Sequence, residues 1–326
     1  MRAVQVLSPT GPADVRVVDV PDPQPGPGDV LIEVHAVGVS FPDLLLSKGM
    51  YQLKPEPPFT LGVDLAGTVV SGPGFAPGDR VAAVIPYGGA GDLAAVPAAA
   101  TLPLPDRLSY VEGAAMPMNY LTALFALGQR GRLRSGETVL VHGASGGVGT
   151  ASLQVARALG ARTIGVVSTE EKAQFARDAG ADEVVLIEHF KDGVLALTDG
   201  RGVDVVVDVV GGEVFTDSLR CLAEQGRLLV VGFAAGQGIP EVRVNRLLLN
   251  NIDVRGVGWG GFAMTKPGVM QEQWDQLLPM VASGVVAPPI GATYALERFG
   301  QALLDLEARR TLGKSVVEVR PVTASA

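Results

Sequence analysis

The chain has 326 residues, of which 47% are hydrophobic and 18% are charged, and its formal net charge is −8. This length favours two domains over one, and the composition is typical of a compact globular α/β protein. The sequence contains no long run of acidic or of basic residues, and no segment is long and apolar enough to suggest a membrane span. We therefore expect a cytoplasmic protein that binds neither nucleic acid nor a membrane.

The first 110 residues predict short strands that are separated by clusters of proline and glycine. The expected strands are Arg2–Leu7, Val15–Val20, Val30–Val37, Gly67–Val70 and Arg80–Val84. Strands this short, with turn residues between them, indicate an irregular β-rich domain.

From about Tyr110 the pattern changes to alternating helices and strands. Apolar residues recur at helical spacing over Val111–Gly128, and further helices are expected at Gly147–Leu159, Glu170–Ala179 and Val214–Glu224. The expected strands between and after them are Thr138–Val141, Thr163–Val167, Glu183–Ile187, Val203–Val209, Arg227–Gly232 and Ile252–Gly256. Such alternation indicates a doubly wound parallel sheet.

The tail returns to mixed character. We expect helices at Gln271–Ala282 and Phe299–Ala308 and a final strand at Ser315–Val319, which we assign to the first domain. The predicted division is thus residues 1–118 with 265–326 as a β-rich catalytic domain, and 119–264 as a cofactor domain. The single cysteine, Cys221, lies in a helix-like stretch and is expected to be buried and inert.

A glycine-rich turn joins the strand Thr138–Val141 to the helix that follows it. In the sequence H-G-A-S-G-G-V-G, Gly146 and Gly147 would let the backbone approach a pyrophosphate at the helix N-terminus, and Gly149 would let helix and strand pack closely. Ala144 replaces the first glycine of the usual fingerprint, but the strand, turn and helix come in the required order. The segment therefore predicts a dinucleotide-binding site.

The end of the next strand indicates which dinucleotide binds. An NAD site would have an acidic residue there, whereas this strand is followed by Ser168 and Thr169, with Lys172 one helical turn later. Two hydroxyls and an ammonium suit a 2'-phosphate, so we expect NADPH. Ser168 with Glu171 also matches a helix capping box, and two adjacent glutamates would have to point outward for a phosphate to bind.

Several motifs spread along nearly the whole chain carry a resemblance. They are Gly78–Val81, Leu121–Ala123, the A-x-G-G-V-G turn, Gly313–Lys314, Phe41–Leu45, Gly49–Gln52 and Gly256–Gly260. Together they resemble the zinc-free medium-chain dehydrogenases/reductases of the NADPH:quinone oxidoreductase (zeta-crystallin-like) family. The resemblance implies a GroES-like β-rich catalytic domain plus a doubly wound Rossmann domain. It also implies an enzyme that passes hydride from NADPH to a quinone, an enone or another conjugated carbonyl compound.

The resemblance further implies a role for individual residues. It places Ser40 and Thr122 near the nicotinamide, and it expects Lys314 to reach the cofactor from the other domain. The residues expected at the phosphates are Ser145, Gly146, Gly147 and Val148, and those at the 2'-phosphate are Ser168, Thr169 and Lys172. Phe233, Ala234 and Trp259 are expected to line the cofactor cleft. The catalytic set is Ser40, Tyr51 and Asp43. In it the two hydroxyls are candidate hydrogen-bond donors, and Asp43 is expected to fix its loop by accepting from backbone groups.

A zinc dehydrogenase of the same superfamily would need cysteine, histidine and glutamate ligands. Here Ser40 stands where the cysteine is expected, and Gly62-Val63-Asp64 stands where a G-H-E triplet would be. We therefore expect no functional metal. Leu45 takes the position from which a tyrosine donates a proton in related enoyl reductases, so we expect solvent to supply the proton.

Two alternative functions remain open: an enoyl-thioester reductase of the same superfamily, and a non-catalytic nucleotide-binding protein of the zeta-crystallin type. The expected partner is a small conjugated carbonyl substrate. If the strand Ile252–Gly256 is the last of its sheet, it leaves an edge that proteins usually cover or pair. Together with the resemblance, this edge predicts a homodimer.

Overall fold

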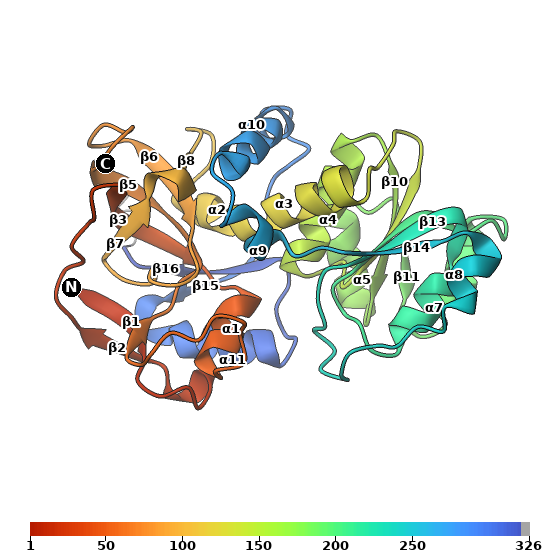
Figure 1. Cartoon of the computed structure of the whole chain (residues 1–326), viewed down its shortest axis with the longest axis horizontal. Coiled ribbons are helices and arrows are strands. Elements are labelled where there is room, and N and C mark those ends of the chain that lie inside the picture. The colour runs from red at the N-terminus through yellow and green to blue at the C-terminus, as the bar shows by residue number, and fades with distance from the viewer. Residues whose placement is uncertain (321–326) are drawn as a thin grey trace. The chain divides into compact units, whose positions relative to one another are not determined.

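The computed structural model describes residues 1–320, and the chain divides into two compact units (Figure 1). Unit 1 comprises Met1–Met118, Pro267–Gln271 and Pro288–Ala326, and unit 2 comprises Asn119–Lys266 and Glu272–Ala287. The first boundary falls where the sequence predicted it. Residues 272–287 belong to unit 2, which corrects their expected place in the first domain.

Side-chain contacts explain why this later segment belongs to unit 2. Gln154 Nε2 donates to the carbonyl of Ala287 at 2.9 Å, and Gln154 Oε1 accepts from the backbone N–H of Ala287 at 3.0 Å. Trp274, on the helix α10 (Val269–Ala282), is almost completely buried. A helix at this place was predicted correctly, but a pattern of helical spacing does not say which core receives the helix.

The central sheet of unit 1 has the order β15-β16-β3-β5-β6-β8, and β7 also pairs with β3. These strands are β3 (Asp29–Gly38), β5 (Asp64–Ser71), β6 (Arg80–Val84), β7 (Leu93–Pro97), β8 (Thr101–Pro103), β15 (Ile290–Ala295) and β16 (Lys314–Glu318). The last strand therefore does return to the first domain, where it pairs antiparallel with β3.

A smaller sheet and three helices complete the described part of unit 1. The sheet has the order β2-β1-β4, from β1 (Arg2–Val6), β2 (Arg16–Asp19) and β4 (Phe59–Thr60), and the helices are α1 (Phe41–Ser47), α2 (Tyr110–Ala115) and α11 (Phe299–Glu307). Short 3-10 turns lie at Pro12–Asp14, Ala98–Ala100 and Leu296–Arg298. Along β3, alternate residues such as Val30, Ile32 and Val34 are fully buried, which is the period-2 pattern of a strand with one face in the core.

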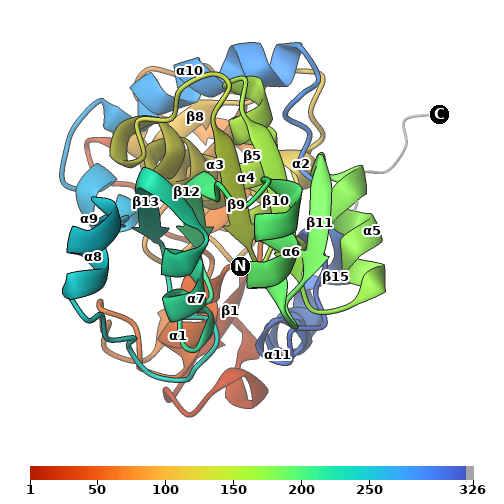
Figure 2. The same cartoon turned by 90° about the vertical axis from the view of Figure 1, so that its right-hand side faces the viewer.

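Unit 2 contains a six-stranded parallel sheet of order β11-β10-β9-β12-β13-β14. Its strands are β9 (Thr138–His142), β10 (Arg162–Val167), β11 (Glu183–Leu186), β12 (Val203–Asp208), β13 (Leu222–Val230) and β14 (Asp253–Gly256). Figure 2 shows the strands from β13 to β11 side by side. The chain runs outward from β9 to β11 and returns to β12 on the other side of β9, so the sheet is doubly wound and its order reverses between β9 and β12.

Helices cover both faces of this sheet because right-handed crossovers in opposite directions place their helices on opposite faces. The helices α4 (Gly147–Ala158) and α5 (Glu170–Asp178) contact β9, β10 and β11. On the other face, α6 (Phe190–Leu197) and α7 (Val214–Arg220) bury Phe190, Val194, Phe215 and Leu219 against the strands. Each such side chain contributes about 1.5–3 kcal/mol through burial.

Two expected helices differ in the structure. The stretch Val111–Gly128 is not one helix but α2, α3 (Pro117–Leu124) and a π-helix (Phe125–Arg130), because Pro117 lacks the N–H that would continue α2. The helix α7 ends at Arg220 and not at Glu224, since Leu222 already pairs with β12. Cys221 therefore lies between a helix and a strand, and it is buried as predicted. Burial raises the pKa of its thiol to about 12, which keeps it unreactive.

The remaining helices of unit 2 are α8 (Asn245–Asn250) and α9 (Trp259–Ala263). No helix in the part of the chain that the structure describes is both long and apolar enough to cross a membrane.

Candidate active site and cofactor site

Three neighbouring strands of unit 1 bring distant residues to one end of the sheet. In the strand register Gly38 on β3 lies opposite both Asp64, the first residue of β5, and Val316 on β16. Ser40 follows the end of β3, and Lys314 is the first residue of β16. The register therefore places Ser40, Asp64 and Lys314 together, although they are far apart in the sequence.

These three side chains form a buried hydrogen-bonded cluster. Asp64 Oδ2 accepts from Ser40 Oγ at 2.8 Å and from Lys314 Nζ at 2.7 Å, and Lys314 Nζ also donates to Ser40 Oγ at 2.6 Å. The other carboxylate oxygen, Asp64 Oδ1, accepts from the backbone N–H of Met118 at 2.8 Å. Removing one member of such a buried ion pair typically costs about 3–5 kcal/mol, because the other charge stays buried without its partner.

Asp43 lies beside this cluster and holds the start of α1. Its two oxygens accept from the backbone N–H groups of Ser40, at 3.0 Å, and of Gly62, at 2.9 Å. These contacts agree with the loop-fixing role expected for Asp43. Its complete burial raises the pKa of this carboxyl to about 7, although both hydrogen bonds and the charge of Lys314 act in the opposite direction.

Tyr51 follows α1 in a bend, and its side chain is half-buried. Burial, and secondarily the charge of Asp43, raise the pKa of its hydroxyl above the ordinary value, so the phenol stays protonated and can donate a hydrogen bond. Within residues 1–320 the Tyr51 hydroxyl has no hydrogen-bond partner.

In unit 2, the glycine-rich turn lies where the strand order reverses. Gly146 is the N-cap of α4 and provides no capping side chain for the first N–H groups of that helix. Gly146, Gly147 and Val148 are half-buried, and Ser145 is buried. Backbone donors at a helix N-terminus bind phosphate oxygens, so this turn fits the pyrophosphate of a dinucleotide.

Two glycines of the turn cannot carry a side chain without a shift of their neighbours. A Cβ on Gly149 would lie 2.1 Å from the carbonyl oxygen of Gly143, and a Cβ on Gly147 would lie 2.4 Å from Asn119 Nδ2. Gly149 thus allows the close helix packing that the motif predicted. Asn119 was not predicted as a site residue, because nothing in its local sequence links it to the turn.

The predicted 2'-phosphate residues come together at the end of β10. Lys172 Nζ donates to Ser168 Oγ at 3.3 Å, and Thr169 Oγ1 accepts from the backbone N–H of Lys172 at 3.3 Å. Thr169 is therefore the N-cap of α5, and the expected capping box of Ser168 with Glu171 is wrong, because the third helical residue after this N-cap is Lys172. Ser168 and Thr169 are exposed, so their hydroxyls are accessible to a ligand.

The other predicted cofactor residues differ in exposure. Phe233 is 39% exposed, and Ala234 is exposed beside it, just after the carboxyl end of β13. Thr122 is buried on α3. Trp259 is also buried, and its Nε1–H donates to Gln273 Oε1 at 2.7 Å. The indole is thus anchored in unit 2, and its predicted contact with the cofactor stays a prediction.

Buried polar groups that the sequence did not single out lie beside the turn, at the carboxyl ends of β9 and β12. Ser218 Oγ donates to the carbonyl of Val214, so it accepts from His142 Nε2 at 2.7 Å. This assignment leaves His142 Nδ1 as an acceptor. Within residues 1–320, neither that atom nor Asp208 Oδ2 has a hydrogen-bond partner. Burial lowers the pKa of His142 to about 4, which keeps the ring neutral.

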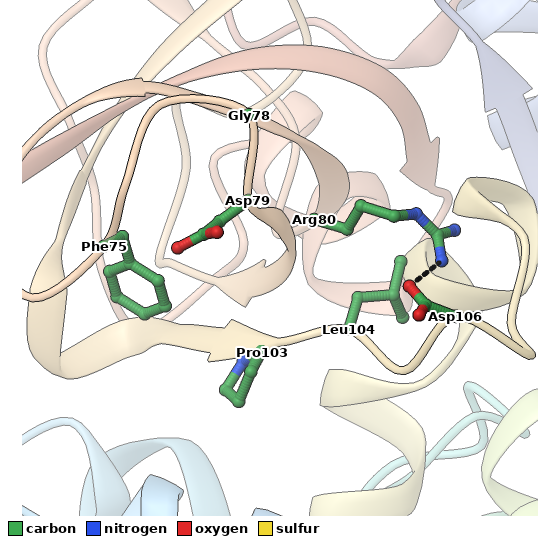
Figure 3. A pocket seen from close by; sticks show the side chains of 7 residues that line it. All are labelled: Phe75, Gly78, Asp79, Arg80, Pro103, Leu104 and Asp106. Carbon is green, nitrogen blue, oxygen red and sulfur yellow. Dashed lines mark ion pairs between the residues drawn. The ribbon is translucent and has the colours of Figure 1, made fainter.

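A separate hollow of about 470 Å³ lies on unit 1. Figure 3 shows that Arg80, one of its lining residues, points toward Asp106 and away from Phe75. The guanidinium donates to the backbone carbonyls of Pro105 and Leu108 and pairs with Asp106 at 3.6 Å. Because its cation is already engaged by the protein, we assign no part of the site to this hollow.

The fold and the two sites define the class of protein: an oxidoreductase with a GroES-like β-rich unit and a Rossmann-type parallel sheet. A family model for the alcohol dehydrogenase GroES-like domain matches residues 26–106, and one for zinc-binding dehydrogenase matches residues 147–283. The chain belongs to the quinone oxidoreductase family of the medium-chain dehydrogenases/reductases.

Individual relatives cover almost the whole chain. The quinone oxidoreductase of Pseudomonas aeruginosa is 35% identical over 326 residues, which are 97% of this chain and 99% of that protein. The crystal structure of a probable oxidoreductase from Mycobacterium abscessus has 43% identity and a TM-score of 0.89, and covers 98% of each chain. The structure of Escherichia coli quinone oxidoreductase complexed with NADPH has 28% identity and a TM-score of 0.89, over 98% of this chain and 100% of that one.

Zinc-binding dehydrogenases hold their metal with cysteine, histidine and carboxylate side chains. No group of three or more His, Cys, Asp or Glu side chains in residues 1–320 lies close enough together to hold a metal ion. At the place where the sequence comparison put the zinc ligands, Ser40 Oγ and Asp64 Oδ2 both bond to the ammonium of Lys314. Oxygen donors that already bind a cationic side chain do not fit zinc, which prefers nitrogen and sulfur ligands.

Proposed function

We propose that this oxidoreductase uses NADPH to reduce a quinone, an enone or another conjugated carbonyl compound. The observation that carries the choice of cofactor is the grouping of Ser168, Thr169 and Lys172 at the end of β10, where an NAD site would have a carboxylate. The choice of substrate is supported by the relatives named quinone oxidoreductase, which align with the chain over nearly its full length.

The chain's own residues would divide the work as follows. The N–H groups at the start of α4 bind the pyrophosphate, and Lys172 with its two hydroxyl neighbours binds the 2'-phosphate. NADPH supplies the hydride. Negative charge then develops on the substrate oxygen, so the site needs hydrogen-bond donors more than it needs a nucleophile. Ser40 and Tyr51 are the candidate donors, and solvent provides the proton.

Measurements of cofactor binding test the proposed cofactor. We expect Lys172→Ala to weaken NADPH binding about tenfold or more, because hydrogen bonds to charged groups contribute about 1.5–3 kcal/mol. Binding of NADH should not change. Lys191→Ala, on α6 and ion-paired with Asp192, is a matched control that should leave both affinities unchanged. Tighter binding of NADH than NADPH by the wild type would contradict the proposed cofactor, as would an unchanged NADPH affinity in Lys172→Ala.

Substrate class is tested by following NADPH oxidation with a panel of quinones, enones and enoyl thioesters. Turnover of the first two classes is the expected result. Faster turnover of thioesters would favour an enoyl-thioester reductase. Tight NADPH binding without oxidation by any acceptor would favour the non-catalytic nucleotide-binding protein.

We also propose a homodimer, joined through the edge of the unit 2 sheet. The strand β14 is the last of that sheet, as the prediction required. Just before it, Val244, Leu248 and Leu249 are each more than 70% exposed. An open strand edge next to exposed apolar side chains is a surface that proteins usually cover. Light scattering should give twice the chain mass, and a monomer at all concentrations would refute the proposal.

A further inference from the structure

We propose that Lys314 is a positioning residue that acts through Ser40, and that together they form a charge-assisted donor for the carbonyl oxygen of the substrate. By the resemblance, Ser40 and Asp64 stand at positions that surround the metal in a zinc dehydrogenase, and here both bond to the ammonium of Lys314. This inference rests on the proposed function, because it assigns a donor to the carbonyl compound that the enzyme would reduce.

The fold makes room for this lysine. A Cβ on Gly38 would lie 2.8 Å from Lys314 Cε and 2.1 Å from the backbone carbonyl oxygen of Ala114, so only glycine leaves space for the lysine stem. Lys314 is only 4% exposed, and lysine is seldom buried to this degree unless it is paired. Gly38, the register of β16 on β3 and the charge of Asp64 together fix the ammonium beside Ser40.

The hydrogen bonds of the cluster allow the Ser40 hydroxyl to turn from Asp64 to a substrate while Asp64 keeps two other donors. Lysine has only donors, so Ser40 Oγ accepts from Lys314 and points its own hydrogen at Asp64 Oδ2. When a carbonyl oxygen arrives, the hydroxyl can turn toward it. Asp64 Oδ2 still accepts from Lys314, and Asp64 Oδ1 still accepts from Met118. No buried charge loses its partner in either state.

The position of the ammonium makes the serine a stronger donor than a serine alone. Lys314 Nζ lies 2.6 Å from Ser40 Oγ, in a region that excludes most water. A donor that is itself polarised by a cation stabilises developing negative charge more strongly, and the low local dielectric increases the effect. Loss of one preorganised oxyanion donor usually lowers turnover by about 10²–10³-fold.

The first test compares Lys314→Met with the wild type. We expect turnover to fall about 10²-fold or more. The dissociation constant of NADPH should stay within about twofold, because the ammonium that the resemblance assigned to the cofactor is engaged by Ser40 and Asp64. The loss should be larger for enones than for electron-poor quinones, because a quinone oxygen needs less help to carry negative charge. An equal fractional loss for all acceptors would indicate a merely structural role and overturn the inference. A matching loss of NADPH affinity would instead assign Lys314 to the cofactor.

Loss of the buried cation alone could prevent folding, so a second variant removes both charges. Asp64→Asn with Lys314→Met keeps a neutral polar group at position 64 that accepts from Met118, and it should fold while staying slow. The matched control in unit 2 is Glu137→Gln with Arg227→Met, which neutralises another largely buried ion pair of 2.6 Å. This control should retain wild-type turnover. Equal turnover of the two double variants would overturn the inference.

Two further measurements separate a charge effect from a packing effect. Ethylammonium or propylammonium should restore part of the turnover of Lys314→Ala but not of Ser40→Ala, and a lack of rescue would count against the proposal.

A bound 4-nitrophenol should be more ionised on the wild type with NADP⁺ than on Lys314→Met, as followed by phenolate absorbance. Equal ionised fractions would overturn the inference. If the wild type ionises the phenol but turns over no acceptor, the proposed function fails and the donor site stands.

Discussion

The two units solve the problem of binding a charged group in different ways. Unit 1 gathers charged side chains, with Asp43, Asp64 and Lys314 all nearly or fully buried at one end of its sheet. Unit 2 offers backbone N–H groups at the start of α4, and the titratable ring beside them, His142, is neutral. Side chains fixed by several strands suit a reacting centre that needs a donor at one point. Backbone donors at a helix N-terminus suit a phosphate that needs several donors at once.

The largest expected effect lies in the backbone site. Gly149→Val should destabilise the turn by more than about 3 kcal/mol and abolish measurable NADPH binding, because its Cβ would lie 2.1 Å from a backbone carbonyl that cannot move aside. Gly261→Ala, on α9, is the control, since a Cβ there meets nothing within 4 Å. Thermal unfolding and cofactor titration of both variants check the prediction. Normal NADPH affinity in Gly149→Val would show that close packing of α4 is not required.

Acidification should act in opposite directions on the stability of the two units, through His142 in unit 2 and Asp43 in unit 1. Burial lowers the pKa of His142 from 6.5 to about 4, so the folded state prefers the neutral ring. Its contribution to stability is complete above pH 6.5 and is lost as the pH falls toward 4, by about 3 kcal/mol in total. Relative to the intrinsic exchange rate at each pH, the protection of the β9 amides against hydrogen exchange should therefore fall over this range. If protection fell equally with pH in a His142→Gln variant, the loss of stability would come from another titratable group.

Asp43 should make the stability of unit 1 change with pH in the opposite direction. Burial raises the pKa of this carboxyl from 3.8 to about 7, so the folded state binds a proton that the unfolded chain has already lost. The stability from this group is complete below pH 3.8 and is lost as the pH rises toward 7. Relative to the intrinsic exchange rate at each pH, the protection of the α1 amides against hydrogen exchange should rise on acidification through this window in the wild type but not in Asp43→Asn. If protection changed with pH equally in the wild type and in Asp43→Asn, the two backbone hydrogen bonds would keep the Asp43 carboxyl ionised in the folded protein.

The same contrast explains what the sequence revealed about each site. The glycine-rich turn of unit 2 occupies one short segment, so the spacing of Gly146, Gly147 and Gly149 was enough to predict its place and its packing. The cluster of unit 1 is assembled by strand register from positions 40, 64 and 314, and register cannot be obtained from composition or periodicity. Ser40 and Lys314 were proposed separately from the family resemblance, but their link through Asp64 was not.

The fold was predictable to a similar degree. Alternating helices and strands identified the doubly wound sheet, because local periodicity is the direct signature of such units. The errors came from tertiary structure. Pairing of Leu222 with β12 ended α7 early, and hydrogen bonds between Gln154 and Ala287 drew residues 272–287 into unit 2.

A smaller effect is expected from Tyr51, the remaining donor candidate of unit 1. Its hydroxyl has no hydrogen-bond partner within residues 1–320, so Tyr51→Phe leaves no buried group unpaired there. A neutral hydrogen bond contributes about 0.5–1.5 kcal/mol, and turnover should fall about tenfold or less. Steady-state kinetics with one quinone and one enone check this. Complete loss of turnover with intact NADPH binding would make Tyr51 an essential acid and would refute protonation by solvent.

The smallest expected effect is that of metal removal, which should leave activity unchanged. Zinc would need Ser40 and Asp64 as ligands, and both already bond to the ammonium of Lys314, whose charge repels a second cation. To admit the metal, the protein would have to expel a buried lysine and break the ion pair with Asp64. Elemental analysis of the purified protein should show no stoichiometric zinc, and a chelator should not alter turnover. If a chelator abolished activity and zinc restored it, Lys314 would not be the cation of this site. Unit 1 would then bind its charged group with a metal ion and not with side chains fixed by strands.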